Sequence, residues 1–154
     1  MEIEGLKIRK AELGDIRRLA ELERACFENG YSEEVLAFFL MSSKHICLVA
    51  DMGGIIIGMA VGELEREENG SFIGHVWTIE VMAPYRRKGI GFLLLSKLEE
   101  ALRAGGAKEC YLEVRADNEP AIRLYEKRGY KLVGLLHDYY GPGKNGLLMK
   151  KRLL

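Results

Sequence analysis

The stretch at residues 81–91, VMAPYRRKGIG, constrains the fold of this chain more than any other. It follows an apolar run typical of a strand and precedes the longest run of helical periodicity, so it predicts a tight turn between a strand and a helix. Its two glycines leave backbone N–H groups open to a ligand, and a helix N-terminus attracts anions. Its three basic side chains add positive charge. The turn therefore predicts a phosphate-binding site.

The Arg-x-x-Gly-x-Gly pattern of this turn is short, and a solvated basic turn at a helix start also produces it. It lacks the Gly-Lys-Ser/Thr ending of an ATP-binding P-loop and the three-glycine spacing of a dinucleotide site. A second motif at residues 112–130 predicts another strand and a helix that carries an inward tyrosine. A phosphate cradle beside a carboxylate and a phenol indicates a group-transfer enzyme with a phosphate-bearing cofactor.

The size and charge of the chain restrict its class. Its 154 residues predict one domain, residues 1–154. The 23 basic and 23 acidic residues cancel, which argues against wholesale nucleic-acid binding. No apolar run approaches the ~20 residues of a membrane span, and no export signal is expected. Three cysteines without Cys-x-x-Cys or metal spacing predict reduced thiols, a cytoplasmic location and no metal site.

Periodicity and turn signals predict seven strands and four helices. The strands are expected at residues 6–10, 46–50, 55–65, 72–82, 109–115, 130–136 and 146–153, and the helices at 15–27, 32–41, 89–104 and 119–128. Asp15 and Ser32 are the expected helix N-caps. The order β-α-α-β-β-β-α-β-α-β-β predicts an α/β (α+β) fold, in which helices cover both faces of a mixed sheet. Two parallel strand pairings are expected where helices connect strands.

The two motifs together resemble those of the GNAT superfamily of acetyl-CoA-dependent N-acetyltransferases, and most closely its ribosomal-protein and protein N-terminal acetyltransferases. The matching residues are 83–91 and 112–115, with Asn118, Ala121, Leu124, Tyr125, Gly129 and Tyr130. The resemblance implies that acetyl-CoA lies between two splayed parallel strands, where its pantetheine pairs with backbone like an added strand. The cofactor-binding residues that it implies are Ile79, Glu80, Val81, Arg86, Arg87, Lys88, Gly89, Ile90, Gly91, Asn118 and Tyr125.

Three side chains are candidates for the chemistry. Glu113 is expected to accept the proton of the acceptor amine; alternatively, it is an outward residue of an alternating strand, paired with a neighbouring cation. Tyr125 matches the family tyrosine near the cofactor sulfur and is expected to support the departing thiolate, but its helical spacing also fits plain core packing. His75 is expected to share the base role through water, or else to be structural. His45 and His137 have no expected partners.

The acceptor is expected to be the N-terminal amine of a protein or peptide, attacked directly without an acyl-enzyme. The expected substrate-binding residues are Glu28 and Tyr31, in the loop between the first two helices, and Tyr139 and Tyr140, in the closing hairpin. The tyrosines could instead only cover sheet edges. The GPGKNG segment at residues 141–146 departs from many members of the resembled family, which carry an acidic segment there. Alternatives are a lysine or small-amine acetyltransferase and a non-catalytic acyl-CoA-binding module. A monomer or weak dimer is expected.

Overall fold

The computed structural model describes residues 3–27 and 30–153 of the chain. In chain order its elements are β1 (Leu6–Lys10), α1 (Ile16–Cys26), α2 (Glu33–Met41), β2 (His45–Met52), β3 (Ile55–Arg66), β4 (Phe72–Val81), α3 (Ile90–Ala104), β5 (Ala107–Arg115), α4 (Glu119–Lys127), β6 (Lys131–Leu136) and β7 (Gly146–Arg152). Short 3-10 turns cover Leu13–Asp15 and Ala83–Tyr85. The predicted α/β fold and element order are confirmed.

The seven strands form one sheet in the order β1-β2-β3-β4-β5-β7-β6. Among the strands that the structure describes, only β4 and β5 pair in parallel, and the connection between them contains α3. The second expected parallel pairing, between β5 and β6, is wrong. The connection through α4 carries the chain one strand further, to the sheet edge, and β7 returns antiparallel into the gap, where it pairs with both β5 and β6.

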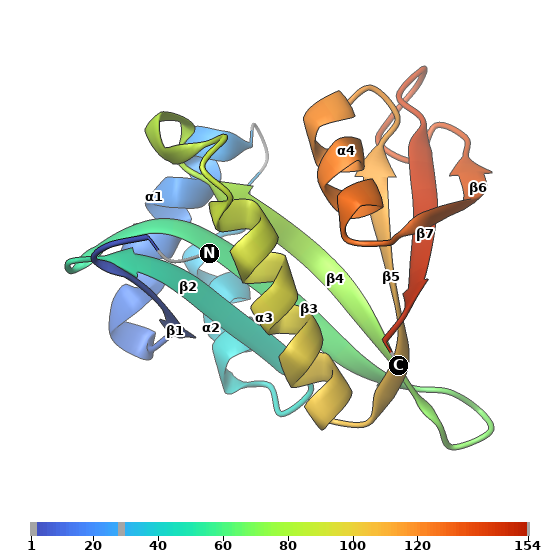
Figure 1. The fold of residues 1–154 in the computed structure, drawn as a ribbon, viewed down its shortest axis with the longest axis horizontal. Helices are drawn as coiled ribbons and strands as arrows, with labels where there is room; N and C mark the ends of the chain where they lie inside the picture. Colours follow the sequence, from blue (N-terminus) through green and yellow to red (C-terminus); the bar gives the residue numbers. More distant parts are fainter. Residues whose placement is uncertain (1–2, 28–29, 154) are drawn as a thin grey trace.

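The sheet opens between β4 and β5. Their parallel pairing ends at Val76 and Leu112, so the last residues of both strands have no pairing with each other. Beyond that point β4 remains paired with β3, and β5 remains paired with β7. Figure 1 shows the result as two diverging halves, with α3 against one half and α4 against the other. The opening exposes a strand edge to a ligand.

Each face of the sheet has its own hydrophobic core. On one face, α3 and α4 pack over a cluster that includes Leu94, Leu98 and Leu102, and α1 and α2 cover the other face. Glycines let α3 approach closely: a Cβ on Gly62 would lie 2.9 Å from a Leu98 methyl, and one on Gly74 would lie 2.9 Å from a Leu102 methyl. The close packing of α3 against the sheet therefore requires glycine, which has no side chain, at these two positions.

The two expected helix N-caps have different outcomes. Ser32 caps α2, because its Oγ accepts a hydrogen bond from the Val35 amide at 3.3 Å. Asp15 occupies the N-cap position of α1, but its side chain does not cap the helix. Its carboxylate accepts from the Glu12 amide and pairs with Arg9 instead. None of the helices within residues 3–27 and 30–153 is long and apolar enough to cross a membrane.

Candidate active site

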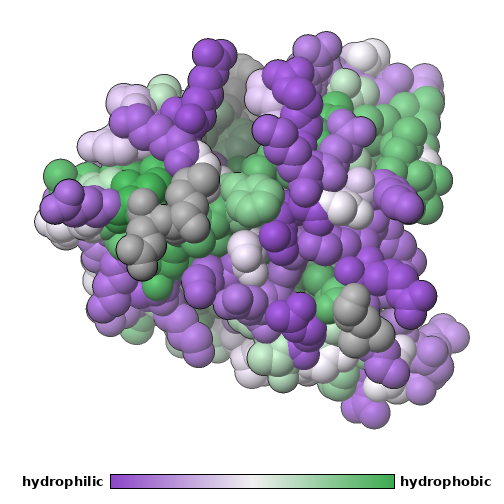
Figure 2. Space-filling model, viewed as in Figure 1, coloured by the Kyte–Doolittle hydropathy of each residue, from purple (hydrophilic) through white to green (hydrophobic). Residues whose placement is uncertain are grey.

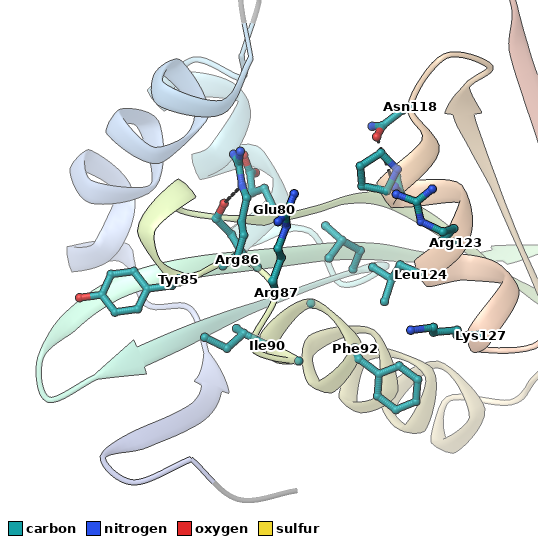
Figure 3. Close-up of a pocket in the computed structure, with 16 residues that line it drawn as sticks. Glu80, Tyr85, Arg86, Arg87, Ile90, Phe92, Asn118, Arg123, Leu124 and Lys127 are labelled. Atoms are coloured by element: carbon teal, nitrogen blue, oxygen red, sulfur yellow. Dashed lines mark hydrogen bonds between the residues drawn. The ribbon is translucent and has the colours of Figure 1, made fainter.

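A cavity of about 980 Å³ occupies the opening between the two halves of the sheet. The end of β4, the turn after it, the first turn of α3 and one side of α4 form its walls (Figure 3). Figure 2 shows hydrophilic side chains on both sides of a hollow in this region. The expected cofactor residues that line it are Ile79, Glu80, Val81, Arg86, Arg87, Gly89, Ile90, Gly91 and Asn118. Lys88 and Tyr125 are not among the lining residues.

The floor of the cavity is an anion cradle made of backbone. Arg87 and Gly89 both have positive φ angles, 64° and 85°, which turn successive amides towards one side. The first hydrogen bond of α3 runs from the Leu93 amide to the Gly89 carbonyl. Within the part of the chain that the structure describes, the amides of residues 87–92 have no acceptor. Unpaired amides at a helix N-terminus attract phosphate.

The basic side chains around the cradle differ from the expected set. The Nε of Arg86 donates to the Val81 carbonyl at 2.8 Å, so this guanidinium is held at the end of β4. The Lys88 amine lies over the Tyr85 ring instead of entering the cavity. Arg123 and Lys127 line the opposite wall from α4 (Figure 3). The sequence reasoning missed these two, although their spacing of four residues places both on one helix face.

Asn118 joins the cavity to the start of α4. Its Oδ1 accepts a hydrogen bond from the Ala121 amide at 3.2 Å and so caps the helix. Because the cap uses the carbonyl oxygen, the side-chain NH₂ keeps its two donors for another partner. Asn118 therefore has both a structural role and a position on the cavity wall.

His75 and Glu113 contact each other directly on the sheet face opposite α3. The Nε2 of His75 lies 2.7 Å from Oε1 of Glu113, so the expected link through water is replaced by a direct bond. The parallel register aligns His75 with Tyr111, and the alternation of β5 puts Glu113 on the same face. Glu113 thus lies on the outward face of an alternating strand and is paired with a neighbour, as in the alternative to a catalytic role. The neighbour is His75. The pair lies beside the point where β4 and β5 separate.

Tyr125 is buried in the core on the α3 side of the sheet. Its ring packs edge-on against Tyr130, with 5.8 Å between centroids. No described residue forms a hydrogen bond with its hydroxyl, and burial raises the pKa of this phenol well above its usual value. A raised pKa favours the protonated phenol, which is the form that can donate a proton or a hydrogen bond.

Three tyrosines converge on the Glu113 side of the sheet. Burial raises the pKa of Tyr31 and of Tyr140 to about 12. The next cause is Glu23 for Tyr31 and Tyr139 for Tyr140, and Glu113 adds a smaller part to both shifts. Burial and Glu113 also raise the pKa of Tyr139. The rings of Tyr139 and Tyr140 meet edge-on at 4.9 Å, and Tyr31 packs on Phe39. The expected substrate residue Glu28 lies outside the described residues.

Two buried acids, Glu23 of α1 and Glu80 of β4, form a pair beside the cavity. Glu80 lines the cavity, and Glu23 contacts Tyr31. Glu23 and Glu80 are only 1% and 5% exposed. Oε1 of Glu23 accepts from the Tyr31 amide at 2.8 Å, which ties α1 to the loop after it. Burial, and then the neighbouring Glu23, raise the pKa of Glu80 to about 11, which favours a shared proton in this pair of acids. The sequence analysis named Glu80 only among the expected cofactor-binding residues and did not single out Glu23, because their contact joins distant segments.

Comparisons with known proteins agree with this geometry. Residues 16–130 match the sequence model of the acetyltransferase (GNAT) family. The chain is 33% identical to an N-alpha-acetyltransferase of Sulfurisphaera tokodaii over 93% of this chain and 90% of that protein. Its fold matches that of NAA60 of Arabidopsis thaliana, solved in complex with a bisubstrate analogue, with a TM-score of 0.86, 21% identity and coverage of 96% and 97%. It also matches the ribosomal-protein-S18-alanine N-acetyltransferase of Escherichia coli, with a TM-score of 0.81, 23% identity and coverage of 96% and 94%.

Proposed function

The chain belongs to the acetyltransferase (GNAT) family, and we propose that it transfers acetyl from acetyl-CoA to the N-terminal α-amine of a protein or peptide. The observation that carries the proposal is that an anion cradle and the His75–Glu113 pair lie on either side of one opening in the sheet. The similarity to an N-alpha-acetyltransferase supports the choice of an α-amine as acceptor.

The cavity fits the proposed cosubstrate. Its volume of about 980 Å³ suits a long ligand, and its amide cradle suits a pyrophosphate. We propose that residues 87–92 hold the phosphates through backbone N–H groups, with Arg123 and Lys127 adding charge from α4. The open edge of β4 near Ile79 and Val81 pairs with the pantetheine amides. A crystal structure of the similar NAA60 contains acetyl-CoA.

The chemistry needs a neutral amine, and the α-amine supplies one readily. An α-amine with a pKa of ~7.8 costs only about 1 kcal/mol to neutralise at pH 7, whereas a lysine with a pKa of ~10.4 costs about 4.6 kcal/mol. A carboxylate in contact with an imidazole is therefore sufficient to take the proton. We propose that Glu113 accepts it, directly or through a water, while His75 holds the carboxylate in place.

Acetyl-CoA supplies an activated thioester, and the amine attacks it directly in the proposed mechanism. Two of the three cysteines are unsuited to an acyl-enzyme: burial raises the pKa of Cys47 and of Cys110 to about 12, and buried thiols are poor nucleophiles. The third, Cys26, is partly exposed and accepts a long contact of 3.7 Å from the Arg86 guanidinium. Tyr125 supports the departing thiolate by donating from its protonated phenol. Tyr31, Tyr139 and Tyr140 contact the peptide backbone near Glu113.

Free-thiol release from acetyl-CoA tests this function. The acceptors are peptides that begin with Ala, Ser or Met, together with N-blocked lysine peptides and polyamines. Release with free N-termini only is the expected result. Release only with blocked peptides or polyamines would move the acceptor to the lysine or small-amine class. Tight binding of acetyl-CoA without release to any acceptor would make the chain an acyl-CoA-binding module.

A further inference from the structure

A cluster of carboxylates surrounds the side of His75 that faces away from Glu113. From its geometry we propose that Glu63, Glu65 and His75 bind a divalent transition-metal ion such as Zn²⁺. One ligand atom from each of the three residues lies within 4.8 Å of the others. Two carboxylates and an imidazole are a ligand set that zinc accepts in proteins. Three protein ligands leave at least one coordination position open.

The second imidazole nitrogen of His75 points into this cluster without a partner. His75 is 7% exposed, and its Nδ1 is buried without a hydrogen bond among the residues that the structure describes. Its closest acidic neighbour is Oε2 of Glu65, at 3.8 Å, which is too long for a hydrogen bond. Leaving a buried nitrogen unpaired is unfavourable, and a metal ion between Nδ1 and the carboxylates removes that penalty.

Neighbouring donors already hold all three ligands in place. The Trp77 indole donates to Oε1 of Glu63 at 3.0 Å, and the Tyr111 hydroxyl donates to Oε1 of Glu65 at 2.5 Å. Each bond leaves the second oxygen of its carboxylate for a metal. The Nε2 of His75 contacts Glu113, and metal-bound histidines usually donate their other ring N–H to a carboxylate. The cluster thus has both the ligands and the outer contacts of a metal site.

The charge around the cluster also favours a cation. No lysine or arginine within residues 3–27 and 30–153 forms an ion pair with Glu63, Glu65 or Glu113. His45 approaches Oε1 of Glu63 at 3.6 Å, although the sequence indicated no partner for it. The metal-free alternative is a doubly protonated His75 between Glu65 and Glu113. Such an imidazolium would occupy Nδ1 with a proton and bind no metal.

Zinc titration of chelator-treated protein, without acetyl-CoA or peptide, tests the site independently of the proposed acetyl transfer. The parent protein is Cys26→Ser, which removes the partly exposed thiol as a competing ligand. We expect one Zn²⁺ per chain, with affinity about tenfold or more weaker in Glu63→Gln and in Glu65→Gln. Glutamine retains the oxygens that accept from Trp77 and Tyr111, so both variants are expected to fold. The matched control, Glu68→Gln in the exposed turn after β3, is expected to bind as the parent does.

The proposal is overturned if the parent binds no zinc at millimolar concentration, or if the Glu63→Gln/Glu65→Gln double variant binds as tightly as the parent. Anomalous scattering at the zinc edge from soaked crystals of the unaltered protein covers the case in which a variant fails to fold. A peak between Glu63, Glu65 and His75 supports the site, and the lack of a peak there rejects it.

Discussion

Nε2 of His75 and Oε1 of Glu113 lie 2.7 Å apart, although 38 positions of the chain separate the two residues. They come from the only two strands of the described sheet that pair in parallel, and the pairing ends at Leu112, the residue before Glu113. The carboxylate is therefore fixed by its histidine partner at the place where the sheet opens.

Replacement of Glu113 by glutamine is expected to lower kcat about 100-fold, because the amide cannot take up the proton of the amine. The affinity for acetyl-CoA is expected to stay unchanged, since Glu113 does not line the cofactor cavity. Steady-state kinetics with an N-terminal peptide, combined with calorimetric titration of acetyl-CoA, measures both. Glu109→Gln, on the same strand, is the control. A full kcat in Glu113→Gln would remove Glu113 from the mechanism.

Replacement of Tyr125 by phenylalanine is expected to lower kcat about tenfold or more, because the variant loses a protonated donor to the leaving thiolate. Stability is expected to change little, since no described residue forms a hydrogen bond with this hydroxyl. Tyr130→Phe is a control on the same core: Tyr130 is also buried, and no described residue meets its hydroxyl with hydrogen-bond geometry. Equal kcat values in the two variants would indicate that Tyr125 acts only in packing.

Loss of both α4 cations, in Arg123→Ala/Lys127→Ala, is expected to raise KM for acetyl-CoA about tenfold at low salt. The difference from wild type is expected to shrink at 0.5 M NaCl, because salt screens exposed charges. Lys97→Ala, on the exposed side of α3, is the control and is expected to leave KM unchanged. A KM difference that does not depend on salt would point to lost packing instead of lost charge.

Glu80 is expected to make stability depend on pH. Its folded-state pKa of about 11 lies above its ordinary value of 4.5, so folding takes up a proton between these limits. The stability that protonated Glu80 contributes is complete below about pH 4.5 and declines as pH rises towards 11.

In Glu80→Gln, the fall in unfolding free energy between pH 6 and pH 9 is expected to be shallower than in wild type, by about 1 kcal/mol per pH unit at most. Urea denaturation at a series of pH values measures this slope. Glu100→Gln, at an exposed position of α3, is the control. Parallel pH profiles for wild type and Glu80→Gln would show that Glu80 is ionised in the folded protein.

Much of the fold could be predicted from the sequence, because strands, helices and turns depend on neighbouring residues. Alternation located β4 and β5, and the glycine turn located the start of α3. Ser32 was recognisable as a cap because its partner, Val35, is three positions away. The wall of the cavity formed by residues 79–91 was predictable for the same reason, since strand, turn and helix are contiguous.

The tertiary structure decided which distant residues meet. Strand order is a long-range choice, so periodicity could not show that β7 separates β5 from β6. The direct His75–Glu113 bond, the buried Glu23–Glu80 pair and the cluster of Glu63, Glu65 and His75 each join residues from different elements. How deeply these side chains are buried depends on the helices that pack against the two faces of the sheet. The sequence by itself determined the local elements and the anion cradle, and only the fold determined the partners of the buried acids.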